Sequence, residues 1–316
     1  MFNRFTVLAS VAAVALSLAA CSPKVETAAA PAEPAAPAAP AIMPFGENAD
    51  VKPFKIGAFE AAALRDGALS VPNDNKTLAV NMKKKDVADL LTANNLSPDT
   101  IDLSVQPLIV RTTDKLFLFD TGASSLFGPT AGKLPVALYS TSVEPGAITD
   151  IFISHAHGDH VGGLVGGQGQ LAYPNAAIHM SANEWAAMKA DKNMAAIVTA
   201  ITPKVVEFQP DAELIPGAVK AVDIKGHTPG HSGYLITSGA ESLLYIGDMA
   251  HHSVISVQQP DWTIAFDGDA KTAQASRKAV IESSAASGQK IYAVHFPFPG
   301  IGKFEKQGDK YVWVAG

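Results

Sequence analysis

The chain has 316 residues, of which 47% are hydrophobic and 17% charged, and its formal net charge is −6. This is the composition of a globular protein that can build a packed core, as one large domain or two smaller ones. The slight acidity excludes the clustered basic surface of a nucleic-acid-binding protein, so we expect no nucleic-acid partner.

An apolar run with a positive start opens the chain. Residues 5–20 form a run that is too short to span a membrane comfortably, which predicts a signal peptide over 1–20. Its end, Leu-Ala-Ala-Cys, resembles a bacterial lipobox and implies cleavage before Cys21 and a lipid anchor on the Cys21 thiol. Ser22 follows, not Asp, and the resemblance then implies an outer-membrane lipoprotein on the periplasmic side of the cell envelope. An ordinary secretory signal that happens to contain a cysteine is the alternative.

The next segment is dominated by Ala, Pro and Glu. Repeated proline blocks helix and sheet, and the segment has little apolar bulk to bury, so residues 21–52 are predicted to be a disordered tether that begins at the acylated Cys21. Residues 53–316 are then the catalytic domain. Because Cys21 is the one cysteine of the chain, no intramolecular disulfide can form.

Strands and helices are mixed along this domain. Residues 104–111 and 116–120 are rich in β-forming side chains around a polar turn and predict a hairpin. The further predicted elements, in chain order, are a buried strand 150–154, a helix 182–190, strands 219–225, 234–237 and 243–246, a helix 271–286, a strand 291–294 and a closing hairpin 304–314.

Four metal-binding side chains follow the strand 150–154 within six positions. Imidazole nitrogen and carboxylate oxygen are the ligands that a Zn²⁺-type ion prefers. His155 and His157 are spaced so that both can face one ion. Asp159 and His160 follow at a tighter spacing and can face a second ion. Such a cluster directly after a buried strand predicts a metal centre.

The pattern His-x-His-x-Asp-His resembles the signature of the metallo-β-lactamase superfamily. The resemblance implies an α/β fold, a four-layer αββα sandwich, and it covers roughly residues 55–316. The other motifs of the family occur in the expected order, at 120–122 (Asp-Thr-Gly), 226–232 (Gly-His-Thr-Pro-Gly-His-Ser), 245–248 (Tyr-Ile-Gly-Asp) and 293–295 (Ala-Val-His). Within the family, residues 126–130 and 298–302 are most similar to methyl parathion hydrolase and its lactonase-like relatives.

What the resemblance implies is a dinuclear metal-dependent hydrolase. A hydroxide that bridges two divalent ions would attack a lactone or an ester, with phosphotriesters left open. Zinc is the first expectation for both ions, and Mn, Fe or Co also suit these ligands. Asp159 and Asp248 are the candidate catalytic residues. The implied ligands are His155, His157 and His227 for the first ion and Asp159, His160 and His295 for the second, with Asp248 bridging both.

Specificity is less defined by the sequence. Phe127, Trp185 and His251 are the candidate residues of the substrate pocket, with core packing as the alternative for the two aromatic residues. His231 is predicted to orient its neighbours rather than to bind metal. A β-lactam-hydrolysing enzyme stays open as an alternative, although Asp248 argues against it. A metal-binding envelope lipoprotein without turnover is the alternative of another class, and the chain could form a homodimer.

Overall fold

The computed structural model describes residues 44–316. The predicted signal peptide, Cys21 and most of the predicted tether lie outside the described residues. The first strand begins at Val51. Within the described part of the chain, no helix combines the length and the apolar character needed to cross a membrane.

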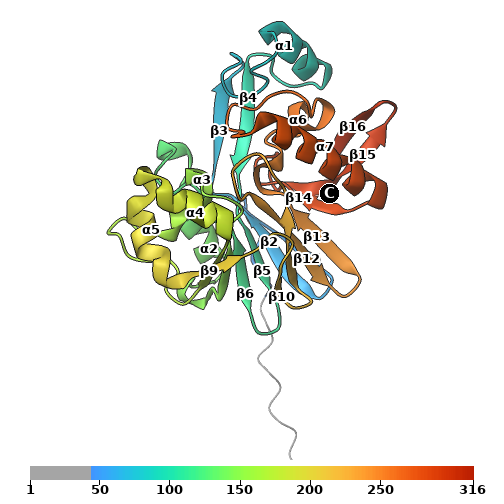
Figure 1. The fold of residues 1–316 in the computed structure, drawn as a ribbon. Coiled ribbons are helices and arrows are strands. Elements are labelled where there is room, and N and C mark those ends of the chain that lie inside the picture. The colour runs from blue at the N-terminus through green and yellow to red at the C-terminus, as the bar shows by residue number, and fades with distance from the viewer. Residues whose placement is uncertain (1–43) are drawn as a thin grey trace, which may run out of the picture. The chain divides into compact units, whose positions relative to one another are not determined.

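Two seven-stranded sheets face each other in the described domain, and helices cover their outer faces (Figure 1). The first sheet has the order β1-β2-β5-β6-β7-β8-β9, and the second runs from β10 to β16 in sequence order. The first sheet contains β1 Val51–Ile56, β2 Phe59–Leu64, β5 Leu108–Arg111, β6 Leu116–Phe119, β7 Asp150–Phe152, β8 Ala177–Ser181 and β9 Val205–Phe208. The second contains β10 Glu213–Ile215, β11 Val219–Asp223, β12 Ser232–Ser238, β13 Glu241–Tyr245, β14 Lys290–Tyr292, β15 Ile301–Gln307 and β16 Lys310–Ala315.

The helices divide between the two sheets. Those on the side of the first sheet are α2 Leu134–Ser140, α3 Gly158–Val161, α4 Ala182–Ala190 and α5 Ala195–Ile201, and those on the side of the second are α6 Ile255–Gln258 and α7 Ala270–Ser287 (Figure 1). This arrangement is the predicted αββα sandwich.

Successive side chains of the buried strands point alternately into the two layers on either side of the sheet. In β6, Leu116 and Leu118 pack into the cluster under the helices of the first sheet, whereas Phe117 and Phe119 enter the cluster between the two sheets. Successive side chains of a strand point to opposite faces, so a strand that is apolar at every position must be covered on both sides. The outer cluster of the second sheet joins residues such as Leu244 to Ile281 of α7.

Most predicted elements are confirmed. The helix 182–190 has the bounds of α4, and β15 and β16 form the closing hairpin. The prediction of one strand over 104–111 is wrong. The chain leaves β4 Thr100–Val105 and enters β5 only at Leu108, because Pro107 has no N–H for a sheet ladder.

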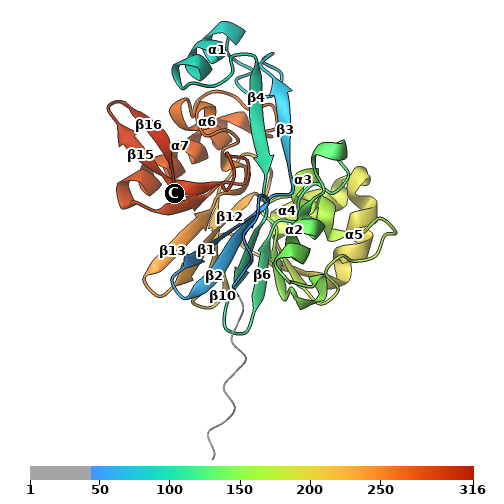
Figure 2. The ribbon, with the colours of Figure 1, turned by 180° about the vertical axis from the view of Figure 1, so that it is seen from behind.

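A third, two-stranded sheet projects from the sandwich. It pairs β3 Gly67–Pro72 with β4, and α1 Lys84–Ala93 lies at its far end (Figures 1 and 2). Leu103 of β4, Leu91 of α1 and Ile255 of α6 share a fourth cluster of buried residues. The extension therefore shares a small core with α6 of the sandwich.

Candidate metal centre

The candidate ligands all follow the carboxyl ends of strands. His155, His157 and α3, which carries Asp159 and His160, come after β7 of the first sheet. The second sheet delivers the other three candidate ligands from the segments after β11, β13 and β14, namely His227, Asp248 and His295. The structure brings all seven together in two groups of potential metal ligands, and a third group, Asp248, His251 and His295, overlaps them.

Three imidazoles converge in the first group. His155 Nε2 lies 2.9 Å from His157 Nδ1, and His227 Nε2 lies 3.2 Å and 3.1 Å from these two atoms. Three ring nitrogens at such distances cannot all be satisfied by hydrogen bonds to one another, since each ring has only one proton when neutral. The convergence fits one cation that accepts a lone pair from each ring.

The carboxylate of Asp248 stands between the two groups. Its Oδ2 is 3.6 Å from His155 Nε2 and 3.4 Å from His227 Nε2. Its Oδ1 is 3.1 Å from His160 Nε2 and 3.0 Å from His295 Nε2. Each oxygen therefore faces a different group, an arrangement that suits a carboxylate shared between two ions.

The second group contains a carboxylate of its own. Asp159 Oδ2 is 3.5 Å from His160 Nε2 and 3.4 Å from His295 Nε2. His160 Nε2 and Asp248 Oδ1 are buried without a hydrogen-bond partner in the described part of the chain. Buried polar atoms left in this state are costly, and a bound cation would satisfy both.

Most of the imidazoles have a partner on the nitrogen that faces away from the cluster. His227 Nδ1 is 2.9 Å from Asp267 Oδ1, His160 Nδ1 is 2.7 Å from Asp120 Oδ2, and His295 Nδ1 donates to Ser104 O at 2.6 Å. Such partners fix the tautomer that leaves Nε2 free to bind a metal.

Asp120 belongs to the Asp-Thr-Gly turn after β6. Its oxygens accept hydrogen bonds from Ser154 N, Ser154 Oγ and Tyr245 Oη besides its contact with His160. The turn thus connects β6 to the loop after β7 and to β13, which is a structural role.

The electrostatics of the cluster favours ionised carboxylates. Burial alone would raise the pKa of Asp159, but His160 and His295 hold it at about 2. Burial also opposes ionisation of Asp248, yet the surrounding imidazoles hold its pKa well below the usual range. Burial lowers the pKa of His157 to about 4, helped by the neighbouring His227, so this ring is neutral at pH 7. Neutral imidazole and ionised carboxylate are the forms that bind metal.

His231 lies beside the cluster with both nitrogens occupied. Its Nδ1 donates to Ile224 O at 2.9 Å, and its Nε2 accepts the Asp248 N–H at 2.9 Å. Burial lowers its pKa to about 3. As predicted, His231 orients a neighbouring residue, the backbone of Asp248, instead of facing the cluster.

The three predicted pocket residues lie in different surroundings. His251 is buried at the cluster, with Nε2 at 3.1 Å from Asp248 Oδ2 and its ring stacked on His295 at 5.3 Å between centroids. Phe127 is half-buried in the loop before Gly128. Trp185 is buried in the core of the first sheet beside residues such as Met188, so it packs in the core and is not a pocket wall.

Sequence reasoning missed two buried acidic residues. Asp267 bonds His227 from a loop 40 residues further along the chain, and nothing in the local sequence indicates that contact. Glu184 contacts both histidine loops. The sequence Ser181-x-x-Glu184 matches a helix capping box, which could have drawn attention to Glu184 but only as a helix start.

Residues 101–286 match the model of the metallo-beta-lactamase superfamily, which is more than half of the chain, and the chain therefore belongs to this superfamily. Among solved structures, it is similar to AidC, described as a dizinc quorum-quenching lactonase in complex with a product. The two are 29% identical with a TM-score of 0.80, over 84% of this chain and 97% of that one. It is also similar to the hydrolase AbOPH of the beta lactamase superfamily, at 26% identity and a TM-score of 0.76, over 86% of this chain and 99% of that one.

A quorum-quenching N-acyl homoserine lactone lactonase shares the fold at 21% identity and a TM-score of 0.57, over 79% of this chain and 100% of that one. No curated protein sequence matches the chain. The predicted family and the predicted likeness to lactonases are confirmed, and the chain is an enzyme of the metallo-β-lactamase-fold hydrolase type. Its His and Asp cluster can hold divalent metal.

Proposed function

We propose that this enzyme is a dinuclear metal-dependent hydrolase that opens lactones or cleaves carboxylic esters. The observation that carries the proposal is the placement of Asp248, whose two oxygens face two separate groups of ligand atoms. The likeness to AidC supports the substrate class, since that protein is described as a dizinc lactonase.

The ligand assignment follows the two groups. One ion would be held by the three imidazoles of the first group and the other by the second group, with Asp248 shared: His155, His157 and His227, then Asp159, His160 and His295. Zinc is the ion we propose, because imidazole and carboxylate suit it, although Mn, Fe and Co prefer similar ligands. Two such ions would lower the pKa of a shared water to about 7 and polarise the substrate oxygen.

The reaction adds one water across the acyl C–O bond and releases a carboxylic acid and an alcohol. In a lactone both products stay in one molecule, a hydroxy acid. The chain's contribution is to hold ionised carboxylates beside imidazoles in a largely buried site, and an imidazole that carries a proton, such as His227, must lose it to bind metal. Burial of this kind strengthens electrostatic stabilisation of the charge that develops on the carbonyl oxygen.

His251 is the residue we propose to contact the substrate. Both of its ring nitrogens are buried without a hydrogen-bond partner in the described chain, so it can still donate or accept one. The half-exposed ring of Phe266 lies 6.0 Å from it, between centroids. A substrate would place its carbonyl oxygen within hydrogen-bond distance of His251 and an apolar group against the ring of Phe266.

We also propose that the enzyme acts at the cell envelope. The sequence that ends at Cys21 supports a lipid anchor, and the Ala- and Pro-rich segment after it would hold the catalytic domain away from the membrane.

The test is a panel of chromogenic substrates with a lactone, a simple ester, a phosphotriester and a cephalosporin. Each is assayed with the metal-replete enzyme and after treatment with a chelator, with metal added back as the control. We expect the lactone or the ester to give the highest kcat/KM, and chelation to abolish it reversibly. A cephalosporin as the best substrate would support the β-lactamase alternative. No turnover of any substrate would support the alternative of a metal-binding envelope lipoprotein without catalytic activity.

A further inference from the structure

Glu184 lies between the two loops that carry the histidines of the first group. It is the third residue of α4, and its side chain is buried. One carboxylate oxygen, Oε1, accepts the Ala156 N–H at 2.8 Å. The other, Oε2, accepts Thr228 Oγ1–H at 2.7 Å and Gly230 N–H at 2.8 Å. A single side chain thus joins the loop of His155 and His157 to the loop of His227.

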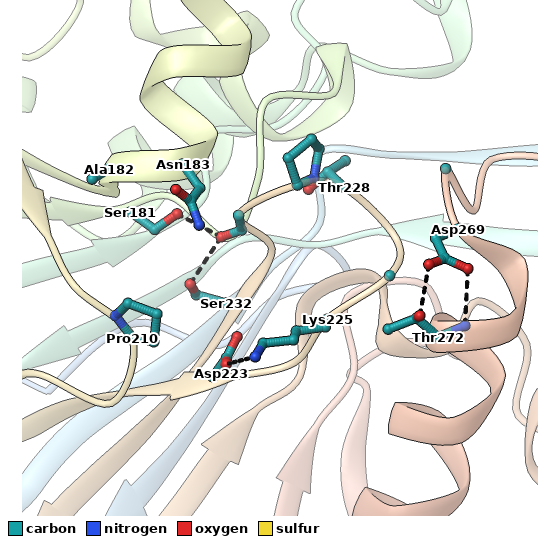
Figure 3. Close-up of a pocket in the computed structure, with 14 residues that line it drawn as sticks. Ser181, Ala182, Asn183, Pro210, Asp223, Lys225, Thr228, Ser232, Asp269 and Thr272 are labelled. Atoms are coloured by element: carbon teal, nitrogen blue, oxygen red, sulfur yellow. Dashed lines mark hydrogen bonds and ion pairs between the residues drawn. The ribbon is translucent and has the colours of Figure 1, made fainter.

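The second of these loops is not packed on its outer side. A cavity of about 450 Å³ lies there, lined by residues that include Thr228, Pro229 and Gly230 (Figure 3). On this side the Gly230 carbonyl accepts hydrogen bonds from Ser181 Oγ at 2.7 Å and Ser232 Oγ at 3.1 Å. Ser181 and Ser232 are labelled in Figure 3. Two hydrogen bonds therefore hold this part of the loop beside the cavity.

The backbone at residue 230 is adapted to this contact. A Cβ atom built on Gly230 would lie 2.2 Å from Glu184 N and 2.2 Å from Ser181 Oγ, so no other residue fits without a shift of the backbone. The close approach brings the loop within hydrogen-bond distance of the carboxylate.

A simple helix cap does not explain Glu184. In a capping box its carboxylate would bond back to the N–H of the first residue, Ser181. Among the described residues, its three hydrogen bonds go to the histidine loops instead. The Ser181 Oγ atom still accepts the Glu184 N–H at 3.2 Å, so the helix is capped without the carboxylate.

We infer that Glu184 is a positioning residue for the first metal ion. By fixing Ala156 and Thr228 to one carboxylate, it sets the distance between the two imidazoles of the first loop and His227. Three ring nitrogens within 3.2 Å of one another need such a constraint. Each nitrogen carries either a proton or a lone pair, so without metal at least one of the three contacts joins two nitrogens of the same kind and is unfavourable. The inference rests on the proposed metal centre and adds a residue outside the ligand set.

The first variant is Glu184→Gln. A glutamine amide has one oxygen and one NH₂ group, so it must turn the NH₂ group towards Ala156 N–H or towards Gly230 N–H, and one of the two hydrogen bonds is lost. Partners of metal ligands typically change metal affinity 10- to 100-fold. We expect Zn²⁺ titration in competition with a chelating dye to show one of two ions bound about 10- to 100-fold more weakly.

The matched control is Asp150→Asn. Asp150 is also a buried carboxylate, with Lys115, Thr149 and His179 as partners, but it lies at the start of β7, away from the histidine loop. We expect its metal affinity to equal that of the wild type even where its thermal unfolding temperature without metal falls. An equal loss of affinity in both variants, or wild-type affinity in Glu184→Gln, would overturn the inference.

A second pair of variants serves if Glu184→Gln does not fold. Thr228→Val removes one hydrogen bond to Glu184 and keeps the shape of the side chain, whereas Thr228→Ser keeps the hydroxyl. We expect several-fold weaker binding of one ion in the valine variant and near wild-type binding in the serine variant. Equal affinities in the two would reject the positioning role.

The same titration separates this inference from the proposed function. A wild-type enzyme that binds two ions while Glu184→Gln is unaffected refutes only the role of Glu184. A wild-type enzyme that binds a single ion refutes the dinuclear proposal, and the response of that ion to Glu184→Gln still decides the inference. If the wild type binds no ion, both fail.

Discussion

Asp267 connects a candidate metal ligand to a buried charge, and Asp267→Asn tests that connection. Its Oδ1 is 2.9 Å from His227 Nδ1, and its Oδ2 accepts from Arg277 Nη2 at 2.8 Å. Burial would raise the pKa of Asp267, but His227 and Arg277 hold it below its usual range. The variant keeps the size of the side chain and removes its charge.

Two effects of known size follow. Removing one partner of a buried ion pair costs about 3–5 kcal/mol. Arg277 keeps hydrogen bonds to Met249 O at 2.8 Å and Pro260 O at 2.9 Å, so we expect the lower end, about 3 kcal/mol. If the amide oxygen turns to Arg277, the NH₂ group faces His227 Nδ1. The proton of His227 must then sit on Nε2, the atom that would bind metal, and affinity should fall about 10- to 100-fold.

Urea unfolding of the metal-free protein measures the first effect, and competition with a chelating dye measures the second. Asp261→Asn is the control. Asp261 forms an ion pair with Lys278, the neighbour of Arg277 on α7, but its side chain is 68% exposed. An exposed pair contributes at most about 1 kcal/mol, so this variant should bind metal as the wild type does. A loss of stability below about 1 kcal/mol in Asp267→Asn, or unchanged metal affinity, would refute the reasoning.

Three further predictions concern protons, ligands and the lipid anchor. Burial lowers the pKa of His227, but Asp248 and Asp267 outweigh it and raise the pKa to about 8. The charged ring stabilises the metal-free fold fully below pH 6.5 and less as the pH rises through 8. Filling the site at pH 7 should therefore release at least one proton to an indicator dye, and no release would contradict this. His227→Ala should lose one ion and nearly all turnover, whereas His231→Ala should keep both ions and lose activity about 10- to 100-fold; the reverse pattern of metal content would reject the assignment. Cys21→Ser should move the protein from the membrane fraction to the soluble fraction. A wild-type protein that is already soluble and unacylated would contradict the lipid anchor.

The parts of the fold that the sequence predicted are those with strong local signals. Strand 150–154 is apolar at most positions and leads straight into the histidine motif, so β7 and the loop after it could be placed together. The closing hairpin has a turn at Gly308, whose φ of 60° suits glycine. The division of 104–111 was missed although Pro107 inside the run was a signal against one continuous strand.

The parts that could not be predicted depend on contacts between distant segments. Glu184 reads as an ordinary first-turn residue of a helix, and only the fold brings Ala156 and Thr228 to its two oxygens. Trp185, the next residue, was assigned to the pocket by resemblance, but the helix turns it into the core. Adjacent positions on a helix point about 100° apart, and a sequence does not say which of them faces the site.

The distribution of the candidate ligands implies that metal and fold stabilise each other. Each group takes side chains from both sheets: the first combines His155 and His157 with His227, and the second combines His160 with His295. An ion bound in either group would connect loops that follow strands of the two different sheets. A metal ion that binds only the folded state stabilises that state by about 4 kcal/mol when the free ion is present at 1,000 times its Kd. The rise of the unfolding temperature with metal should then depend on both groups. An ion in the first group alone would leave the loops of the second group unconnected, and the converse holds for an ion in the second group. Variants of His227 and His295 should each lose part of that rise, and a variant that lost all of it would show that the two ions bind as one unit.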